Sequence, residues 1–159
     1  MGTQTPLEPF IGDRAPRVLA VDDEPVQLQI MSALLTRWRC TVLTAVDGAD
    51  ALAAAHADSP DVVLLDVRLP DQSGFDVCRI LQTDPATAHI PVIFLTAMSG
   101  ADALTKAFET GGHDFITKPF KAGELAARMG AKLRQKYSED LLRERRTKFS
   151  ALVRHEDAR

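Results

Sequence analysis

The chain has 159 residues, of which 45% are hydrophobic and 26% charged, a composition typical of an ordinary globular domain with its own core. Its two cysteines are too few for a disulfide framework or a zinc site, and no apolar run is long enough to span a bilayer. The net charge of −3 hides an asymmetry: residues 1–120 hold 8 Lys and Arg against 16 Asp and Glu, and residues 121–159 hold 11 against 6. We expect a cytoplasmic protein whose mixed-charge tail binds neither nucleic acid directly nor a membrane.

The order of predicted elements follows from apolar patterning. Residues 1–16 contain three prolines and two glycines and no periodic pattern, which predicts a flexible leader. Five short apolar runs then alternate with five segments of helical periodicity. The predicted strands are RVLAV (17–21), TVLTAV (41–46), DVVLLD (61–66), PVIFLTA (91–97) and DFIT (114–117), and the predicted helices lie around 30–38, 49–56, 75–81, 101–110 and from 121 onward.

The strands lack polar alternation, which is typical of a parallel sheet buried on both faces. Alternation of strands and helices favours right-handed crossovers with helices on both sides of the sheet. The sequence therefore predicts an α/β, doubly wound fold. Such a fold places its functional site beyond the carboxyl ends of the strands.

Polar side chains follow four of the predicted strands. The first strand ends in Asp22 and Asp23, the third in Asp66, the fourth in Thr96 and the fifth in Lys118. Each residue alone has an ordinary explanation: a helix cap before Pro25, a loop aspartate, a second cap or a surface lysine. Because parallel strands end at one edge, we expect all of them to meet in one pocket.

Clustered carboxylates need a cation, and a site with few protein oxygen ligands suits Mg²⁺. Lys118 is a compact positive charge suited to a phosphoryl oxygen, and the hydroxyl of Thr96 can hydrogen-bond another. Asp66 stands alone at the central strand, so it is the best candidate for a nucleophile that forms an acyl phosphate. Asp22 and Asp23 are then placed as metal ligands.

Four motifs carry a family resemblance: VDDEP, LLDVRLPDQSGFDVC, PVIFLTA and GGHDFITKPF. With them, the chain from about 17 to 137 resembles a receiver domain of the two-component response regulators. The resemblance implies a flavodoxin-like (βα)5 fold with strand order 2-1-3-4-5. It also implies that Asp66 accepts a phosphoryl group from a histidine kinase or phosphotransfer protein, and that Mg²⁺ binds Asp22, Asp23, Asp66 and the backbone carbonyl of Arg68.

The same resemblance assigns a switch. Thr96 would turn toward the phosphate, Lys118 would pair with it, and the Lys118–Pro119 peptide bond would be cis. Phe115 occupies the position of a switch aromatic that is often Tyr, so here it would act by packing alone. The face made by residues 101–110, 114–117 and the last helix would then shift and be read by an output domain or partner protein.

Two residues flank the pocket, Arg68 two positions after the nucleophile and Met98 two after Thr96. The guanidinium of Arg68 either faces solvent or shields the phosphoryl group from water. Arg68 also weighs against an Mg²⁺-dependent phosphatase, because those enzymes place an acidic residue at this position as general acid. The last alternative is a degenerate receiver that is no longer phosphorylated and acts as a constitutive binding module. The presence of all the acidic and basic site residues argues against it. We therefore expect a regulatory domain that catalyses only its own phosphorylation and dephosphorylation.

The tail has no Gly or Pro after position 137, so we expect the last helix to continue through residues 138–159 as an extension. Leu142, Phe149 and Leu152 suggest a coiled-coil connector and a homodimer, although Arg145 interrupts the stripe. The segment KFSALVRHED also resembles the start of a histidine-kinase phosphoacceptor helix. The alternatives for His155 are an exposed histidine on a polar helix and a receiver fused to a kinase.

Overall fold

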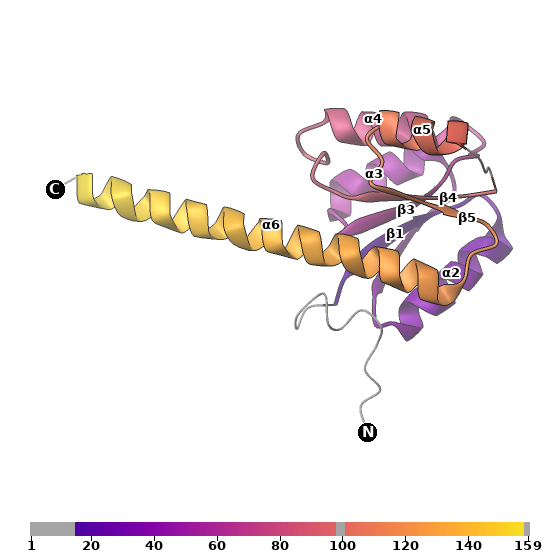
Figure 1. The fold of residues 1–159 in the computed structure, drawn as a ribbon, viewed down its shortest axis with the longest axis horizontal. Helices are drawn as coiled ribbons and strands as arrows, with labels where there is room; N and C mark the ends of the chain where they lie inside the picture. The colour runs from indigo at the N-terminus through magenta and orange to yellow at the C-terminus, as the bar shows by residue number, and fades with distance from the viewer. Residues whose placement is uncertain (1–14, 98–100, 158–159) are drawn as a thin grey trace, which may run out of the picture.

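A parallel sheet with helices on both faces forms the body of the protein (Figure 1). The structure, a computed structural model, describes residues 15–97 and 101–157. The sheet has the expected order β2-β1-β3-β4-β5, and all its pairings are parallel. The strands are β1 Arg17–Val21, β2 Thr41–Ala45, β3 Val62–Asp66, β4 Val92–Thr96 and β5 Asp114–Thr117. The helices are α2 Pro25–Arg37, α3 Gly48–Asp58, α4 Gly74–Thr83, α5 Ala101–Glu109 and α6 Ala122–Asp157.

Each face of the sheet has its own hydrophobic core, because successive strand residues point to opposite sides. One core joins β1 residues such as Val18 to Leu35 of α2 and Met129 of α6. The other joins residues such as Leu65 to α3, α4 and α5. The central strands are buried on both faces, which is why their sequences are continuously apolar. The predicted flavodoxin-like α/β fold is confirmed.

Local signals explain where α3 begins and ends and where α4 begins. The carboxylate of Asp47 accepts a hydrogen bond from the amide of Asp50, and the hydroxyl of Ser73 accepts one from the amide of Phe75. Helix α3 ends at Ser59, whose backbone is left-handed with φ of 44°. These caps satisfy amides that the helices themselves leave free, and they fix where the loops at the sheet edge begin.

Helix α6 is the expected extended C-terminal helix. It has 36 residues and runs without a break from the body into the yellow segment that projects away from the sheet (Figure 1). Its last buried hydrophobic residue is Leu133. Beyond that point the exposed apolar side chains include Leu142, Phe149 and Leu152. Within the described residues, no helix combines the length and apolar character needed to cross a membrane. The predicted leader lies almost wholly outside the described residues.

Candidate functional site at the carboxyl edge of the sheet

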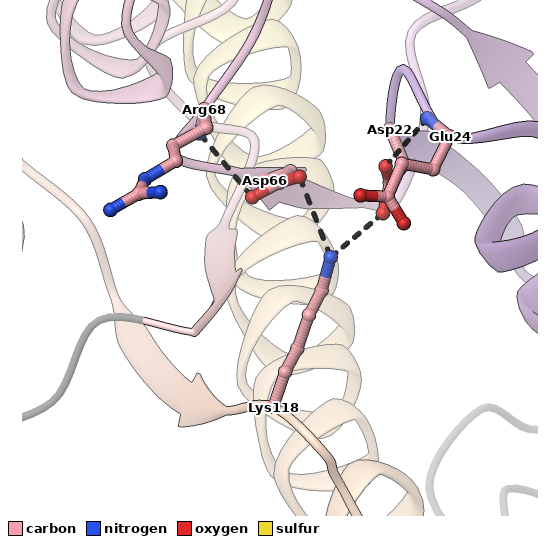
Figure 2. A network of polar contacts seen from close by, with 5 residues as sticks. All are labelled: Asp22, Glu24, Asp66, Arg68 and Lys118. Carbon is pink, nitrogen blue, oxygen red and sulfur yellow. Dashed lines mark hydrogen bonds and ion pairs between the residues drawn. The ribbon is translucent and has the colours of Figure 1, made fainter.

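Three charged side chains from separate strands meet at the carboxyl edge of the sheet (Figure 2). Asp22 follows β1, Asp66 ends β3, and Lys118 follows β5. The ammonium nitrogen of Lys118 lies 2.8 Å from Oδ2 of Asp22 and 3.4 Å from Oδ2 of Asp66. The side chain of Asp22 is 1% exposed and that of Asp66 is 13% exposed. The predicted convergence of these residues is therefore present in the fold.

Asp23 completes a group of three carboxylates. Asp22, Asp23 and Asp66 each offer an oxygen, and these atoms all lie within 4.8 Å of one another. All donors are hard oxygens, and Asp23 is exposed, which leaves one side open to water. This donor set fits Mg²⁺, which prefers oxygen ligands and retains several waters. One lysine cannot balance three carboxylates, so the pocket has a net negative charge that favours a divalent cation.

Backbone contacts around Asp22 explain the acidic triplet at positions 22–24. The amide of Glu24 donates to Oδ1 of Asp22 at 3.0 Å, and the amide of Asp22 donates to the carbonyl of Ala45 at 3.1 Å. Helix α2 has Pro25 in its first turn, Glu24 as its N-cap and no side-chain cap. The alternative explanation of the triplet as a helix cap is therefore wrong. The aspartates are aimed at the pocket instead.

The environment sets the charge of the candidate nucleophile. Burial raises the pKa of Asp66, and the positive charge of Lys118 and the hydrogen bond from the Arg68 amide partly oppose this. Burial by itself lowers the pKa of Lys118, but the hydrogen bond to Asp22 and the charge of Asp66 outweigh it, so the pKa is raised. Lys118 is therefore protonated and positively charged at neutral pH. It lies beside Asp66, whose charged form is disfavoured by burial.

The other predicted residues surround this centre. Thr96 ends β4, is 1% exposed, and its carbonyl accepts a hydrogen bond from the Lys118 amide at 2.7 Å. Phe115 is partly buried against the core beneath α4 and α5. The Lys118–Pro119 peptide bond is cis. Met98 lies outside the described residues.

Arg68 has two separate relations to the site. Its amide donates to Oδ1 of Asp66 at 3.3 Å, so its backbone stands beside the candidate phosphoacceptor. Its side chain is exposed and extends away from Asp22 and Lys118 (Figure 2). The backbone of Arg68 thus lies beside Asp66, and its guanidinium is exposed.

The sequence did not predict a structural role for Asp71. It lies in the loop after β3, and its carboxylate accepts hydrogen bonds from the amides of Gly48 and Ala49 at 2.8 and 3.0 Å. The only available signal was the turn composition of PDQSG, which predicts a loop but no partner for the aspartate. The contact joins the loop after β3 to the first turn of α3.

Comparison with known proteins identifies the family. Residues 18–130 match the model of the response regulator receiver domain. The chain is 44% identical over 129 residues to the response regulator PleD of Caulobacter vibrioides, covering 81% of this chain and 28% of PleD. It is 40% identical over 120 residues to the DNA-binding dual master transcriptional regulator RpaA of Synechocystis sp., covering 76% and 50%.

Solved structures of receiver domains are similar to this chain. The signal receiver domain of a Luxo repressor protein from Vibrio parahaemolyticus has a TM-score of 0.75 at 27% identity, with 81% of this chain and 98% of that chain covered. The BeF3-activated DrrB receiver domain has a TM-score of 0.67 at 36% identity, with 76% and 98% covered. The chain belongs to the receiver domain family of response regulators in two-component signalling. It spans from about a quarter to half the length of the curated relatives described here.

Proposed function

We propose that the chain is a phosphorylation-dependent switch in which Asp66 accepts a phosphoryl group from a histidine kinase or phosphotransfer protein. The observation that supports this most strongly is the meeting of Asp22, Asp66 and Lys118 from three separate strands, with Asp23 beside them. Residues 17–137 act as the receiver, and residues 138–159 act as a helical connector. The function is regulatory, and the only chemistry is phosphoryl transfer to and from Asp66.

The proposed reaction needs a carboxylate nucleophile. An oxygen of Asp66 attacks the phosphorus of a phosphohistidine; the O–P bond forms as the P–N bond breaks, and its electron pair returns to the imidazole nitrogen. The charge of Lys118 opposes part of the rise in the pKa of Asp66 that burial causes. Its ammonium lies 3.4 Å from Oδ2 of Asp66, where it would pair with the oxygens of the arriving group. Water later attacks the acyl phosphate and releases phosphate, which resets the switch.

The residues that would hold Mg²⁺ are Asp22, Asp23, Asp66 and the backbone carbonyl of Arg68. When bound, the ion supplies positive charge that screens the approach of an anionic donor to an acidic pocket. The carboxylates keep their arrangement because Asp22 is fixed by backbone contacts and Asp66 is the last residue of a central strand.

Phosphorylation adds charge of about −1.5 to −2 and three acceptor oxygens. Lys118 and the hydroxyl of Thr96 are the donors that respond, and drawing Thr96 inward frees space for Phe115 to repack. Phe115 belongs to β5, which follows α5 and precedes α6 in the chain, and its side chain packs on the core beneath α5. We propose that its movement alters the face made by α5, β5 and α6. We propose that an output domain or partner protein reads this face.

A groove beside the pocket suits the phosphodonor. It has a volume of about 800 Å³ and lies between α2 and the segment that links β5 to α6. Ile30, Leu34, Pro119 and Phe120 give it an apolar lining, and Lys118 reaches its edge. Ile30 is 52% exposed. A helical phosphodonor seated on this apolar surface would present its histidine next to Asp66.

The side chain of Arg68 has a proposed role in the lifetime of the phosphorylated state. It is exposed and adjacent to Asp66, so its guanidinium can fold over the phosphoryl group and exclude water. The Arg68→Ala variant is expected to lose its phosphoryl group faster than the wild type. An equal or longer lifetime in Arg68→Ala would leave the arginine without this role.

The test of the proposed function uses acetyl phosphate as donor, with and without Mg²⁺, and intact-protein mass spectrometry. The wild type should gain one phosphoryl group only when Mg²⁺ is present, and Asp66→Asn should gain none. Asp76→Asn, which alters an exposed aspartate on α4, is the matched control and should behave as the wild type. Equal phosphorylation of Asp66→Asn and the wild type would contradict the assignment.

A further inference from the structure

The carboxylate of Asp71 joins the loop between β3 and α4 to the start of α3, two segments that are far apart in sequence. Oδ1 accepts a hydrogen bond from the amide of Gly48 at 2.8 Å, and Oδ2 accepts one from the amide of Ala49 at 3.0 Å. The two amides belong to the first turn of α3, whereas Asp71 lies in the loop between β3 and α4. Each carboxylate oxygen has its own donor, so the contact fixes orientation as well as distance.

The loop that carries Asp71 is closed at its base. Arg68 and Ser73 form an isolated antiparallel bridge, and the amide of Gly74 donates to the carbonyl of Val67 at 2.7 Å. Asp71 lies at the tip between them, three residues after Arg68. The base of this loop therefore carries Arg68, whose amide contacts Asp66, and the tip is held by α3.

Gly48 leaves room for this close approach. A Cβ atom at position 48 would lie 2.5 Å from Cγ of Gln72, the residue next to Asp71. Two features thus bring the start of α3 and the β3–α4 loop together: a glycine that leaves room for Gln72, and a carboxylate that accepts hydrogen bonds from the first amides of α3. The hydrogen bond from Gly48 is the largest cause that lowers the pKa of Asp71, so its carboxylate is ionised at neutral pH and suits the positive end of α3.

We infer that Asp71 is a positioning residue that anchors the β3–α4 loop on the amino end of α3 and so holds the Arg68 carbonyl where Mg²⁺ binding and phosphorylation of Asp66 need it. The inference rests on the proposed function. Asp71 itself acts only through the loop, because its two carboxylate oxygens are occupied by α3. Without the anchor the tip is released, and the position of the Arg68 backbone is less sharply defined.

Asp47 provides a matched control. Its Oδ1 accepts a hydrogen bond from the amide of Asp50 at 2.7 Å, so it caps the same helix from the preceding residue. No hydrogen bond described for Asp47 reaches the β3–α4 loop. Asp47→Ala and Asp71→Ala therefore each remove a carboxylate from the start of α3, but only Asp71→Ala releases the loop that carries Arg68.

The experiment compares the full-length wild type with Asp71→Ala, Asp71→Asn and Asp47→Ala. Mg²⁺ affinity is measured by titration calorimetry, and amide hydrogen exchange at Arg68 and Gly74 is measured by NMR in the metal-free protein. Asp71→Ala should bind Mg²⁺ about tenfold more weakly, the lower end of the loss for groups that support metal ligands. It should also exchange faster at both amides. Asp71→Asn keeps one acceptor oxygen and should fall between Asp71→Ala and the wild type.

Asp47→Ala should lower Tm as Asp71→Ala does, while its Mg²⁺ affinity and its exchange at Arg68 and Gly74 match the wild type. If both alanine variants change Mg²⁺ affinity and exchange equally, Asp71 is only a helix cap and the inference is overturned. A wild type that neither binds Mg²⁺ nor is phosphorylated would overturn the proposed function and this inference together. A functional wild type with an unaltered Asp71→Ala would overturn the inference alone.

Discussion

Lys118 and Asp22 are separated by 96 positions in the chain, and their charged groups lie 2.8 Å apart at the edge of the sheet. The contact joins the ends of β1 and β5, which are not neighbours in the sheet. It shows how a positive charge is held within an acidic pocket. Lys118 limits the repulsion among the carboxylates while the pocket keeps its net negative charge.

Replacing Lys118 by Met should separate metal binding from signalling. Without the ammonium, the three carboxylates repel each other more strongly, so Mg²⁺ should bind about tenfold more tightly. The same variant should lose the response to phosphorylation, because the phosphoryl oxygens lack their partner. Titration calorimetry and NMR spectra with beryllium fluoride measure the two effects. Lys121→Met, at an exposed position, is the control. Weaker Mg²⁺ binding by Lys118→Met would contradict this electrostatic account.

Stability should fall as the pH drops below about 6.5 because of His113. Its Nδ1 accepts a hydrogen bond from the amide of Val92 at 3.1 Å, which requires the neutral ring. Burial lowers the pKa of His113 below its ordinary value of 6.5. The positive charge of Lys132 lowers this pKa further, and the negative charge of Glu139 raises it by less than the other two effects lower it. The unfolded chain therefore takes up a proton before the folded chain does, and stability is lost as the pH falls.

His113→Asn tests the origin of this pH dependence. Asn keeps an acceptor for the Val92 amide but cannot titrate, so the loss of stability between pH 7.5 and about 5.5 should become smaller. The remaining loss should include His89, whose pKa is also lowered by burial. Urea unfolding followed by the fluorescence of the single tryptophan, the buried Trp38, measures the effect. An unchanged pH profile in His113→Asn would exclude His113 as the cause.

Gly74 should tolerate no side chain. An added Cβ would lie 2.9 Å from Cα of Val67 and against the carbonyl of Asp66, and both are backbone atoms that cannot turn aside. Gly74→Ala is expected to lower the free energy of unfolding by about 1–3 kcal/mol and to weaken Mg²⁺ binding. Gly123→Ala is the control: nothing lies within 4 Å of its added Cβ, and it should stabilise α6 by up to about 1 kcal/mol. Equal stability of the two variants would contradict the packing described for this loop.

The projecting part of α6 should support weak self-association. Phe149 and Leu152 are 68% and 65% exposed, and Leu142 is 52% exposed, so two copies could bury these side chains along one helical stripe. Phe149→Ser combined with Leu152→Ser should weaken the dimer at least about tenfold in sedimentation equilibrium. Arg145→Leu should strengthen it by completing the stripe. A concentration-independent monomer for both the wild type and Arg145→Leu would exclude a homodimer through this helix.

The topology and the main pocket follow from patterns that can be read locally. Continuous apolar runs predict a parallel sheet, and charged residues at the ends of β1, β3 and β5 must then share an edge. This is why Asp22, Asp66 and Lys118 were predicted together although they are distant in the chain. The projecting helix was predicted equally well, because nothing in its sequence interrupts a helix.

Side-chain contacts between distant elements were beyond prediction, because they depend on how loops and helices are placed in space rather than on periodicity. The clamp from Asp71 to Gly48 is one example. Another is Lys136, whose ammonium lies 3.4 Å from the buried carboxylate of Asp61 and ties α6 to the amino end of β3. Helical spacing places Lys136 on α6, but it does not say which aspartate its side chain will meet.

The central claim is that Asp66 becomes an acyl phosphate, and chemical trapping tests it most directly. After incubation with acetyl phosphate and Mg²⁺, borohydride would deliver one hydride to the acyl carbon with loss of phosphate. A second hydride would reduce the resulting aldehyde, so that a phosphorylated aspartate becomes homoserine. Peptide mass spectrometry should then find homoserine at position 66 only, in an amount that depends on Mg²⁺. Homoserine at another aspartate, or a phosphorylated protein with Asp66 unmodified, would contradict the account.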